Sequence, residues 1–317
     1  MYYFGIDLGG TNISAALVDE NFNIISKKRY KTMIPTTKEV LCDKMANLTF
    51  EILNEYEGII DKIPFIGIGC PGNVNPKNGE VRFLPNLFIE NWKIKSMMEE
   101  RLKKRVYIEN DANLAAYGEY IAGAAIGTRS AITITIGTGI GGGIILDGKI
   151  YSGFNHWGAE IGHMVIMHNG HKCNCGRRGC YEAYASATAL AVATKEALKN
   201  DDRSSIMWEI IEGDINNVSP KTAFIGMKMN DSLATQVVNK YIEYLSVGII
   251  NIINIFQPEI ICIGGGISNE GEYLINLIED YIKNNSCMQV PENQTKICIA
   301  KLGNNAGIIG AACFGEM

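Results

Sequence analysis

The chain opens each of its halves with the same succession of strands and glycine turns, which limits its possible folds more than any other feature does. Residues 4–24 read FGIDLGGTNISAALVDENFNI, and residues 134–150 read ITIGTGIGGGIILDGKI. Each segment runs from an apolar strand through a Gly/Thr-rich turn to a second apolar strand, an acidic turn and a third strand. Glycine hairpins are common, so a chance likeness is the alternative. We interpret the repetition as a duplicated α/β architecture whose two lobes hold one ligand.

Further strands and helices follow both segments. In the first half we expect strands at 2–7, 11–19, 22–30, 65–70 and 105–110, helices at 36–56, up to 103 and from 111 on, and an irregular region from 71 to 91. In the second half we expect three strands, several helices up to 256, strands at 259–266 and 296–300, and a closing helix from about 305. The apolar run at 247–256 is too short to cross a bilayer and contains two asparagines, so it reads as a core helix.

The composition narrows the classes of function. The chain has 317 residues, enough for two lobes. Its net charge of -5 and pI of about 5.5 argue against a surface for nucleic acid or anionic lipid. The start, MYYFGIDLGG, lacks the basic and apolar regions of a signal peptide. Because six of the nine cysteines are scattered and no export signal is evident, we expect reduced thiols and a cytoplasmic protein.

Three glycine-rich segments follow predicted strands and are candidates for phosphate binding. They are DLGGT (7–11), GTGIGGG (137–143) and GGG (264–266). Glycines let backbone N–H groups approach a phosphate closely, and Asp7 offers Mg²⁺ a carboxylate beside phosphate oxygens. One such turn by itself is commonly a plain hairpin. None matches the Walker or dinucleotide-binding pattern, so the three together predict an ATP cleft of another kind.

An acidic residue stands where a strand passes into a helix, in the segment ENDAN (109–113). Asp111 can cap the helix, which is the simpler interpretation. It can also act as a general base that accepts a proton from a hydroxyl attacking a γ-phosphate, with Asn110 orienting the substrate. The local sequence favours the cap and leaves both roles open.

Three of the nine cysteines lie within the eight residues CNCGRRGC (173–180), and His163 lies ten residues upstream. One histidine and three cysteines supply the four ligands of a structural Zn²⁺ site. His168 and His171 are alternative ligands, and a disulfide is the alternative to a metal. A disulfide would leave one thiol over and suits an oxidising compartment, so the spacing favours zinc.

A closed zinc site has no open position for catalysis, so its role would be to hold a loop in place. Glu160 lies three residues before His163, and Glu182 lies two residues after Cys180. Zinc would therefore fix two carboxylates in one loop region, where they can accept hydrogen bonds from sugar-like hydroxyls.

The segments DLGGT, ENDAN, IGTGIGGG, AEIGH, CNCGRRGCYE and IGGGIS occur in this order. With them the chain resembles the ROK family of bacterial sugar kinases and related repressors, and most of all its glucokinase branch. The resemblance extends through LGNNAGIIGAA (302–312). It implies a two-lobed actin/hexokinase-like (ribonuclease H-like) ATPase fold with duplicated βββαβα units, Mg-ATP as a substrate, and a homodimer. The implied lobes are 1–125 with 303–317, and 126–302 with the zinc loop 163–180.

The resemblance also implies roles for individual residues, with Asp111 as the catalytic base. The residues that match sugar ligands or border the sugar are Gly72, Asn86, Asn110, Asp111, Glu160, His163 and Glu182. Those that match the ATP-binding segments are Asp7, Gly9, Gly10, Thr11, Thr138, Gly139, Gly265 and Gly266. The implied metal ligands are His163, Cys173, Cys175 and Cys180 for zinc and Asp7 for magnesium.

The predicted activity is transfer of the γ-phosphoryl group of ATP to a hexose hydroxyl, first of all O6 of glucose. The sequence departs from the family in FNHWGAEIGH, where His156 and Trp157 replace small residues. Fructose, mannose, allose, N-acetylglucosamine and N-acetylmannosamine are therefore alternatives. Trp157 can stack on a sugar or pack at a lobe or dimer interface, and packing is the expected role.

Two alternatives come from other classes. Sugar-sensing repressors of the family carry a helix-turn-helix domain before the DLGGT segment, which here begins at residue 7. Together with the negative charge, this disfavours a repressor that binds nucleic acid. A non-catalytic sugar-binding scaffold is disfavoured because both Asp7 and Asp111 are retained.

Overall fold

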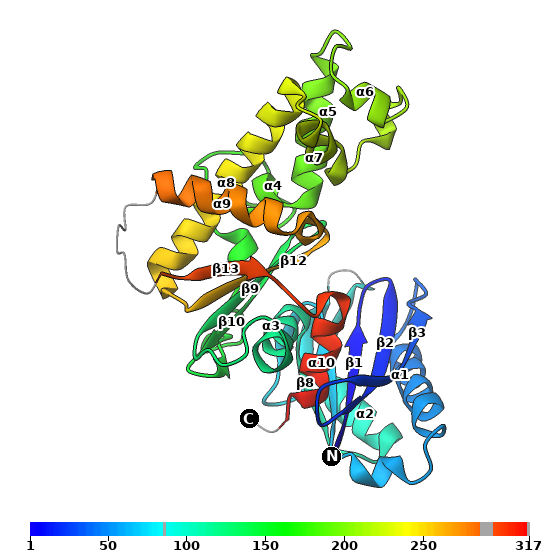
Figure 1. Cartoon of the computed structure of the whole chain (residues 1–317). Coiled ribbons are helices and arrows are strands. Elements are labelled where there is room, and N and C mark those ends of the chain that lie inside the picture. The colour runs from blue at the N-terminus through cyan, green and yellow to red at the C-terminus, as the bar shows by residue number, and fades with distance from the viewer. Residues whose placement is uncertain (85–86, 286–293, 316–317) are drawn as a thin grey trace. The chain divides into compact units, whose positions relative to one another are not determined.

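A computed structural model describes residues 1–84, 87–285 and 294–315 (Figure 1). These residues form two compact units. Unit 1 comprises Met1–Thr133, Gly143–Ala159 and Lys301–Met317, and unit 2 comprises Ile134–Gly142 and Glu160–Ala300. The units begin and end at different residues from the expected lobes, because residues 143–159 belong with unit 1. Gly143 lies so close to Ala116 and the backbone of the helix from 111 to 122 that a larger residue would overlap them.

The first five-stranded sheet lies in unit 1 and has the strand order β3-β2-β1-β4-β8. Its strands are β1 (Tyr2–Leu8), β2 (Asn12–Asp19), β3 (Ile24–Lys31), β4 (Ile66–Cys70) and β8 (Val106–Asn110). The first three are antiparallel, as their short connections require, whereas β1, β4 and β8 run parallel. The carboxyl ends of these three parallel strands therefore meet at one edge of the sheet.

Helices pack against both faces of this sheet: α1 (Lys38–Leu53), α2 (Ile94–Leu102), α3 (Asp111–Ala122) and α10 (Ala306–Cys313). Successive strand residues point to opposite faces. Phe4, Ile6 and Leu8 of β1 enter a buried core shared with α1 and α2. On the other face, side chains at Gly5 and Gly67 would overlap the backbone of α10. These glycines allow the closing helix, red in Figure 1, to lie directly on the sheet.

Residues 73–84 and 87–92 contain a second, three-stranded antiparallel sheet in unit 1, so the predicted irregular region is wrong. Its strands are β5 (Asn73–Asn75), β6 (Glu80–Leu84) and β7 (Ile89–Trp92), in the order β5-β6-β7. The buried side chains Val81, Leu84, Ile89 and Trp92 hold it against the core. Turn-forming Asn, Gly and Pro residues interrupt the alternation, which hides these short strands from a reading of the sequence.

The other five-stranded sheet has the order β11-β10-β9-β12-β13. Its strands are β9 (Ala131–Ile136), β10 (Ile140–Leu146), β11 (Lys149–Ile150), β12 (Ile260–Gly265) and β13 (Lys296–Ile299). The division between the units passes through β9 and β10. The same strand–turn–strand plan thus opens both five-stranded sheets, as the repeated sequence predicts.

The helices of unit 2 are α4 (Glu182–Ala185), α5 (Ala187–Lys199), α6 (Met207–Ile210), α7 (Pro220–Lys228), α8 (Ser232–Phe256) and α9 (Glu272–Asn285). The apolar run 247–256 is the last part of α8, where Ile249 and Ile252 are buried, and the predicted core helix is confirmed. Among the described residues, no helix is both long and apolar enough to cross a membrane.

Candidate active site in two parts

Two carboxylates meet at the edge of the unit 1 sheet where the parallel strands end. Asp7 pairs in register with Gly69 of β4, and the next β4 residue, Cys70, pairs with Asn110 of β8. Asp111 follows directly as the first residue of α3. Gly307, near the start of α10, lies against the Asp7 carboxyl group and the backbone carbonyl of Asp111. Residues 104 apart in the sequence are thereby brought to one edge of one sheet.

The electrostatics of these acids depart from those of exposed carboxylates. Burial raises the pKa of Asp7 to about 6, the negative charge of Asp111 adds to this, and Lys27 opposes it. Burial also raises the pKa of Asp111, although the backbone N–H of Ala112 partly offsets this by donating to its carboxylate. Two buried carboxyl groups, one of which raises the proton affinity of the other, form a site that favours a cation.

The residue that caps helix α3 is Asn110, so the interpretation of Asp111 as the cap is wrong. The Asn110 side-chain oxygen accepts hydrogen bonds from the N–H groups of Ala112 at 2.9 Å and Asn113 at 3.2 Å. Its amide group donates to the carbonyl oxygen of Gly72 at 3.2 Å. Asn110 therefore satisfies the helix end, which leaves the Asp111 carboxylate available for chemistry.

The turn of the DLGGT segment is fixed by backbone and side-chain hydrogen bonds. The N–H of Gly9 donates to the carbonyl of Asn12 at 2.8 Å. Just after β3, Thr32 donates from its hydroxyl to the carbonyl of Gly9 at 2.9 Å and from its N–H to that of Thr11 at 2.8 Å. Thr11 and Gly10 form the tip of the turn. β3 thus holds the first predicted phosphate segment beside Asp7.

In unit 2 the predicted zinc ligands come together. The ligand atoms of His163, Cys173, Cys175 and Cys180 all lie within 4.8 Å of one another. The Cys175 and Cys180 sulfurs are 3.6 Å apart, and the Cys173 sulfur is 3.7 Å from Nδ1 of His163. Tetrahedral Zn²⁺ with its usual bond lengths places such ligand atoms about 3.5 to 3.8 Å apart. A disulfide would require about 2.05 Å, so the donor set fits zinc.

Glu182 connects this cluster to the second glycine turn. Its Oε1 accepts a hydrogen bond from the Cys173 thiol at 2.9 Å and lies 3.6 Å from Nδ1 of His163. Its Oε2 accepts from the N–H of Ile140 at 3.4 Å, and a side chain at Gly139 would overlap it. The Cys/His cluster, Glu182 and the Thr138–Gly139 turn therefore form one continuous arrangement.

The remaining predicted residues lie as follows. Glu160 directly precedes the short 3-10 helix Ile161–His163, so it adjoins the zinc cluster. Gly265 ends β12 with φ of 85°, and Gly266 begins a 3-10 helix, Gly266–Glu270. The ring of His171 lies 4.7 Å from that of Tyr184 rather than in the cluster. Asn86 lies outside the described residues.

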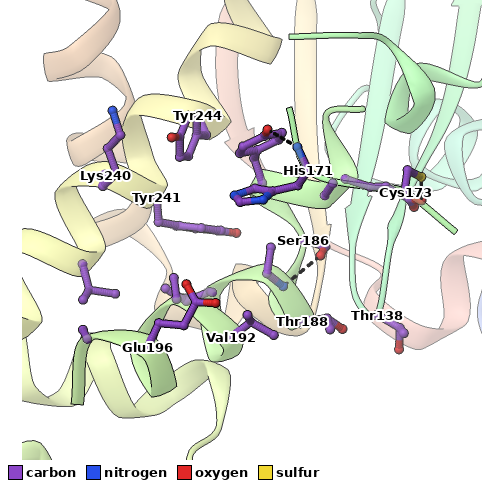
Figure 2. Close-up of a pocket in the computed structure, with 18 of the residues that line it drawn as sticks. Thr138, His171, Cys173, Ser186, Thr188, Val192, Glu196, Lys240, Tyr241 and Tyr244 are labelled. Atoms are coloured by element: carbon purple, nitrogen blue, oxygen red, sulfur yellow. Dashed lines mark hydrogen bonds between the residues drawn. The ribbon is translucent and has the colours of Figure 1, made fainter. Parts of the chain in front are cut away.

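A pocket of about 620 Å³ in unit 2 extends from this arrangement along helices α5 and α8 (Figure 2). Thr138 and Cys173 line one end, and Lys240 and Tyr244 line the other. Sequence reasoning missed its wall on α5 and α8, because these residues read as ordinary amphipathic helix positions.

Trp157 of unit 1 was expected to pack at an interface, and it is 56% exposed in this structure.

Comparisons with known proteins agree with this architecture. The ROK family model matches residues 3–316. A glucokinase from Thermotoga maritima is 36% identical over 97% of this chain and 95% of its own length. A xylose repressor from Bacillus spizizenii is 32% identical over 98% of this chain and 75% of its own length. A Streptomyces griseus ROK glucokinase, solved in complex with glucose and AMPPNP, is 31% identical with a TM-score of 0.81, covering 98% of both chains.

A ROK hexokinase from Thermus thermophilus is 29% identical with a TM-score of 0.78, covering 98% of this chain and 97% of its own. The repeated strand–turn–strand plan and these two structural neighbours define the actin/hexokinase-like fold, as predicted. Within that fold, the chain belongs to the ROK family.

Proposed function

We propose that this protein is an ATP-dependent hexose kinase that transfers the γ-phosphoryl group of ATP to a sugar hydroxyl, with O6 of glucose as the first acceptor. The observation that carries the proposal is the pair Asp7 and Asp111 at the carboxyl ends of parallel strands. The glucokinases among the relatives support the class of reaction. The structure of the Streptomyces griseus relative with glucose and AMPPNP supports the two substrates.

In this proposal Asp111 is the general base. Burial raises the pKa of its carboxyl, which makes the carboxylate a stronger proton acceptor than an exposed aspartate. Asn110 and Gly72, joined by a hydrogen bond, border the acceptor sugar. Asp7 and the DLGGT turn face the phosphates and would hold the magnesium ion, which offsets phosphate charge during transfer. In unit 1, Gly9, Gly10 and Thr11 would contact ATP phosphates; in unit 2, Thr138, Gly139, Gly265 and Gly266 are the proposed nucleotide contacts.

The zinc cluster has a structural role in the proposal. Bound zinc would supply bonds that hold residues 163–180 in one conformation. Glu182 touches both the cluster and the turn at Gly139, so an ordered loop also orders this carboxylate. With Glu160 and His163 it is then ready to accept and donate hydrogen bonds to sugar hydroxyls. We also propose a homodimer in the cytoplasm, on the family resemblance and the reduced cysteines.

ADP release with Mg-ATP and a panel of hexoses and N-acetylhexosamines tests the proposal. Glucose is expected to be phosphorylated fastest. Asp111→Asn, which removes the base and keeps the shape, is expected to abolish turnover and retain sugar binding in calorimetry. Turnover by Asp111→Asn would exclude this residue as the base.

A second candidate keeps the kinase and changes the sugar. His156 has a positive φ of 64°, its ring nitrogen Nδ1 lies 3.1 Å from the Ser152 hydroxyl, and its carbonyl accepts a hydrogen bond from Asn73, next to Gly72. A residue held in this way beside the proposed sugar loop favours a role in sugar choice. Preference for a sugar other than glucose in the panel would support this candidate.

A further inference from the structure

Strand β3 separates its side chains into two faces. Ile24, Ser26, Lys28 and Tyr30 are partly buried, and the residues between them are exposed. Lys28 of the first face forms ion pairs with Glu55 at 2.6 Å and Glu51 at 4.0 Å on α1. The exposed face carries Lys27, Arg29 and Lys31, which we call the β3 basic row. Within the described residues, none of these three forms an ion pair.

The strand register places this row on the same face of the sheet as Asp7. Arg29 pairs with Ser14 on β2, and Ser14 pairs with Asp7 on β1. Directly paired residues point to the same face of a sheet, so Arg29 and Asp7 lie on one face two strands apart, about 10 Å. Lys31 pairs with Asn12, which directly follows the DLGGT turn. The row therefore runs up to the first predicted phosphate segment.

Lys27 is held at this site by a contact from the far end of the chain. Its Nζ donates a hydrogen bond to the Asn305 side-chain oxygen at 2.7 Å. Asn305 precedes α10, and Gly307 of that helix lies against the Asp7 carboxylate. The positive charge of Lys27 also acts on Asp7, since it lowers the pKa of the Asp7 carboxyl group. The lysine is thus fixed on the side of the sheet where the two carboxylates lie.

We propose that the β3 basic row binds the phosphate groups of the phosphoryl donor. This deepens the proposed kinase function and rests on it. The three glycine-rich phosphate segments contain one acid and no basic side chain. Lysine and arginine are the side chains that other kinases and nucleotide-binding proteins place against the β- and γ-phosphates. The β3 basic row supplies that missing charge beside Asp7.

The competing explanation is that these charges protect an edge strand. β3 is the outer strand of its sheet, and lysines on an edge strand prevent pairing with other chains. Protection of the edge strand requires charged side chains on β3, but they can point to either face of the sheet. Lys28 lies on the same strand with its side chain on the opposite face, so it provides a matched control.

The test is calorimetric binding of inorganic tripolyphosphate and of Mg-ATP to the full chain. Changing Lys27, Arg29 and Lys31 together to Gln should weaken binding of both by at least roughly tenfold, because charge-assisted contacts to phosphate are lost. Lys28→Gln should leave both within about twofold, since the Lys28 side chain points to the opposite face and is paired with Glu55. In the kinase assay the triple variant should raise KM for Mg-ATP and leave KM for the sugar unchanged.

Equal tripolyphosphate binding by the triple variant and the unchanged protein would overturn the proposal, as would an equal loss in Lys28→Gln. If the triple variant fails to fold, Lys27→Gln alone takes its place, and unchanged binding by that variant would be equally decisive. Binding of tripolyphosphate does not depend on a sugar acceptor. Failure to phosphorylate any sugar in the panel would refute the proposed kinase activity. The phosphate site would still be tested independently by tripolyphosphate binding.

Discussion

Removing the Asp7 charge should stabilise the ligand-free protein, although it removes a group that the proposed reaction needs. Burial and the neighbouring Asp111 raise the pKa of Asp7 from its ordinary 3.8 to about 6. A folded state that holds a proton more tightly than the unfolded state loses stability as the pH rises through this interval. Each pH unit is worth about 1.36 kcal/mol. Ionised Asp7 therefore lowers the free energy of unfolding by about 3 kcal/mol above pH 7.

The substitution Asp7→Asn keeps the shape of the side chain and removes the ionisation. Its free energy of unfolding should exceed that of the unchanged protein by about 3 kcal/mol at pH 8 and by only about 0.5 kcal/mol at pH 4, where Asp7 is protonated in the folded state. Urea unfolding followed by tryptophan fluorescence measures this. Trp92 and Trp157 lie in unit 1 and Trp208 in unit 2, so two of the three reporters are in the unit concerned.

The control is Asp19→Asn, which changes a half-buried aspartate at the end of β2. Hydrogen bonds from the side chain and backbone of Asn23 lower the pKa of Asp19, so its charge stabilises the folded state at neutral pH and the substitution should destabilise it. If Asp7→Asn has no higher free energy of unfolding than the unchanged protein at pH 8, ionised Asp7 does not destabilise the fold. A difference in that free energy that is the same at pH 4 and pH 8 would also exclude ionisation as its cause. In the kinase assay Asp7→Asn should lose activity despite its greater stability.

The other predictions concern the base, the zinc site and the closing helix. Because burial raises the pKa of Asp111, kcat/KM should fall on acidification with a midpoint above the ordinary pKa of an aspartate. A midpoint at or below that ordinary pKa would count against Asp111 as the base. Cys175→Ser should lose zinc, measured by elemental analysis, and should bind sugar more weakly. Cys42→Ser, which lies outside the cluster, should keep its zinc and its sugar affinity. Sugar binding that survives the loss of zinc would contradict the role of zinc in ordering the loop. Gly67→Ala should lower the free energy of unfolding by about 3 kcal/mol in urea, since a methyl group there overlaps α10, and an unchanged midpoint would disprove that packing.

The sequence by itself determined those features whose chemistry is local. Glycine turns after apolar strands, an acid at a strand end and four candidate zinc ligands within 18 residues all depend on short stretches of chain, so spacing and residue type indicate them. The alternation of strands and helices likewise follows from hydrophobic periodicity. Periodicity failed at residues 73–92, where turn residues interrupt three short strands that are held by burial against the core.

Only the tertiary structure decided which local features meet. Asp7 and Asp111 come together because β1, β4 and β8 are parallel and end at one edge, which no spacing in the sequence reveals. Glu182 joins the Cys/His cluster to the glycine turn at 139, and the Lys27 side chain donates a hydrogen bond to Asn305, 278 residues away in the sequence. The choice of Asn110 over Asp111 as the helix cap depends on side-chain direction at the end of β8. Such contacts result from strand register and packing, which are set by the whole core and not by neighbouring residues.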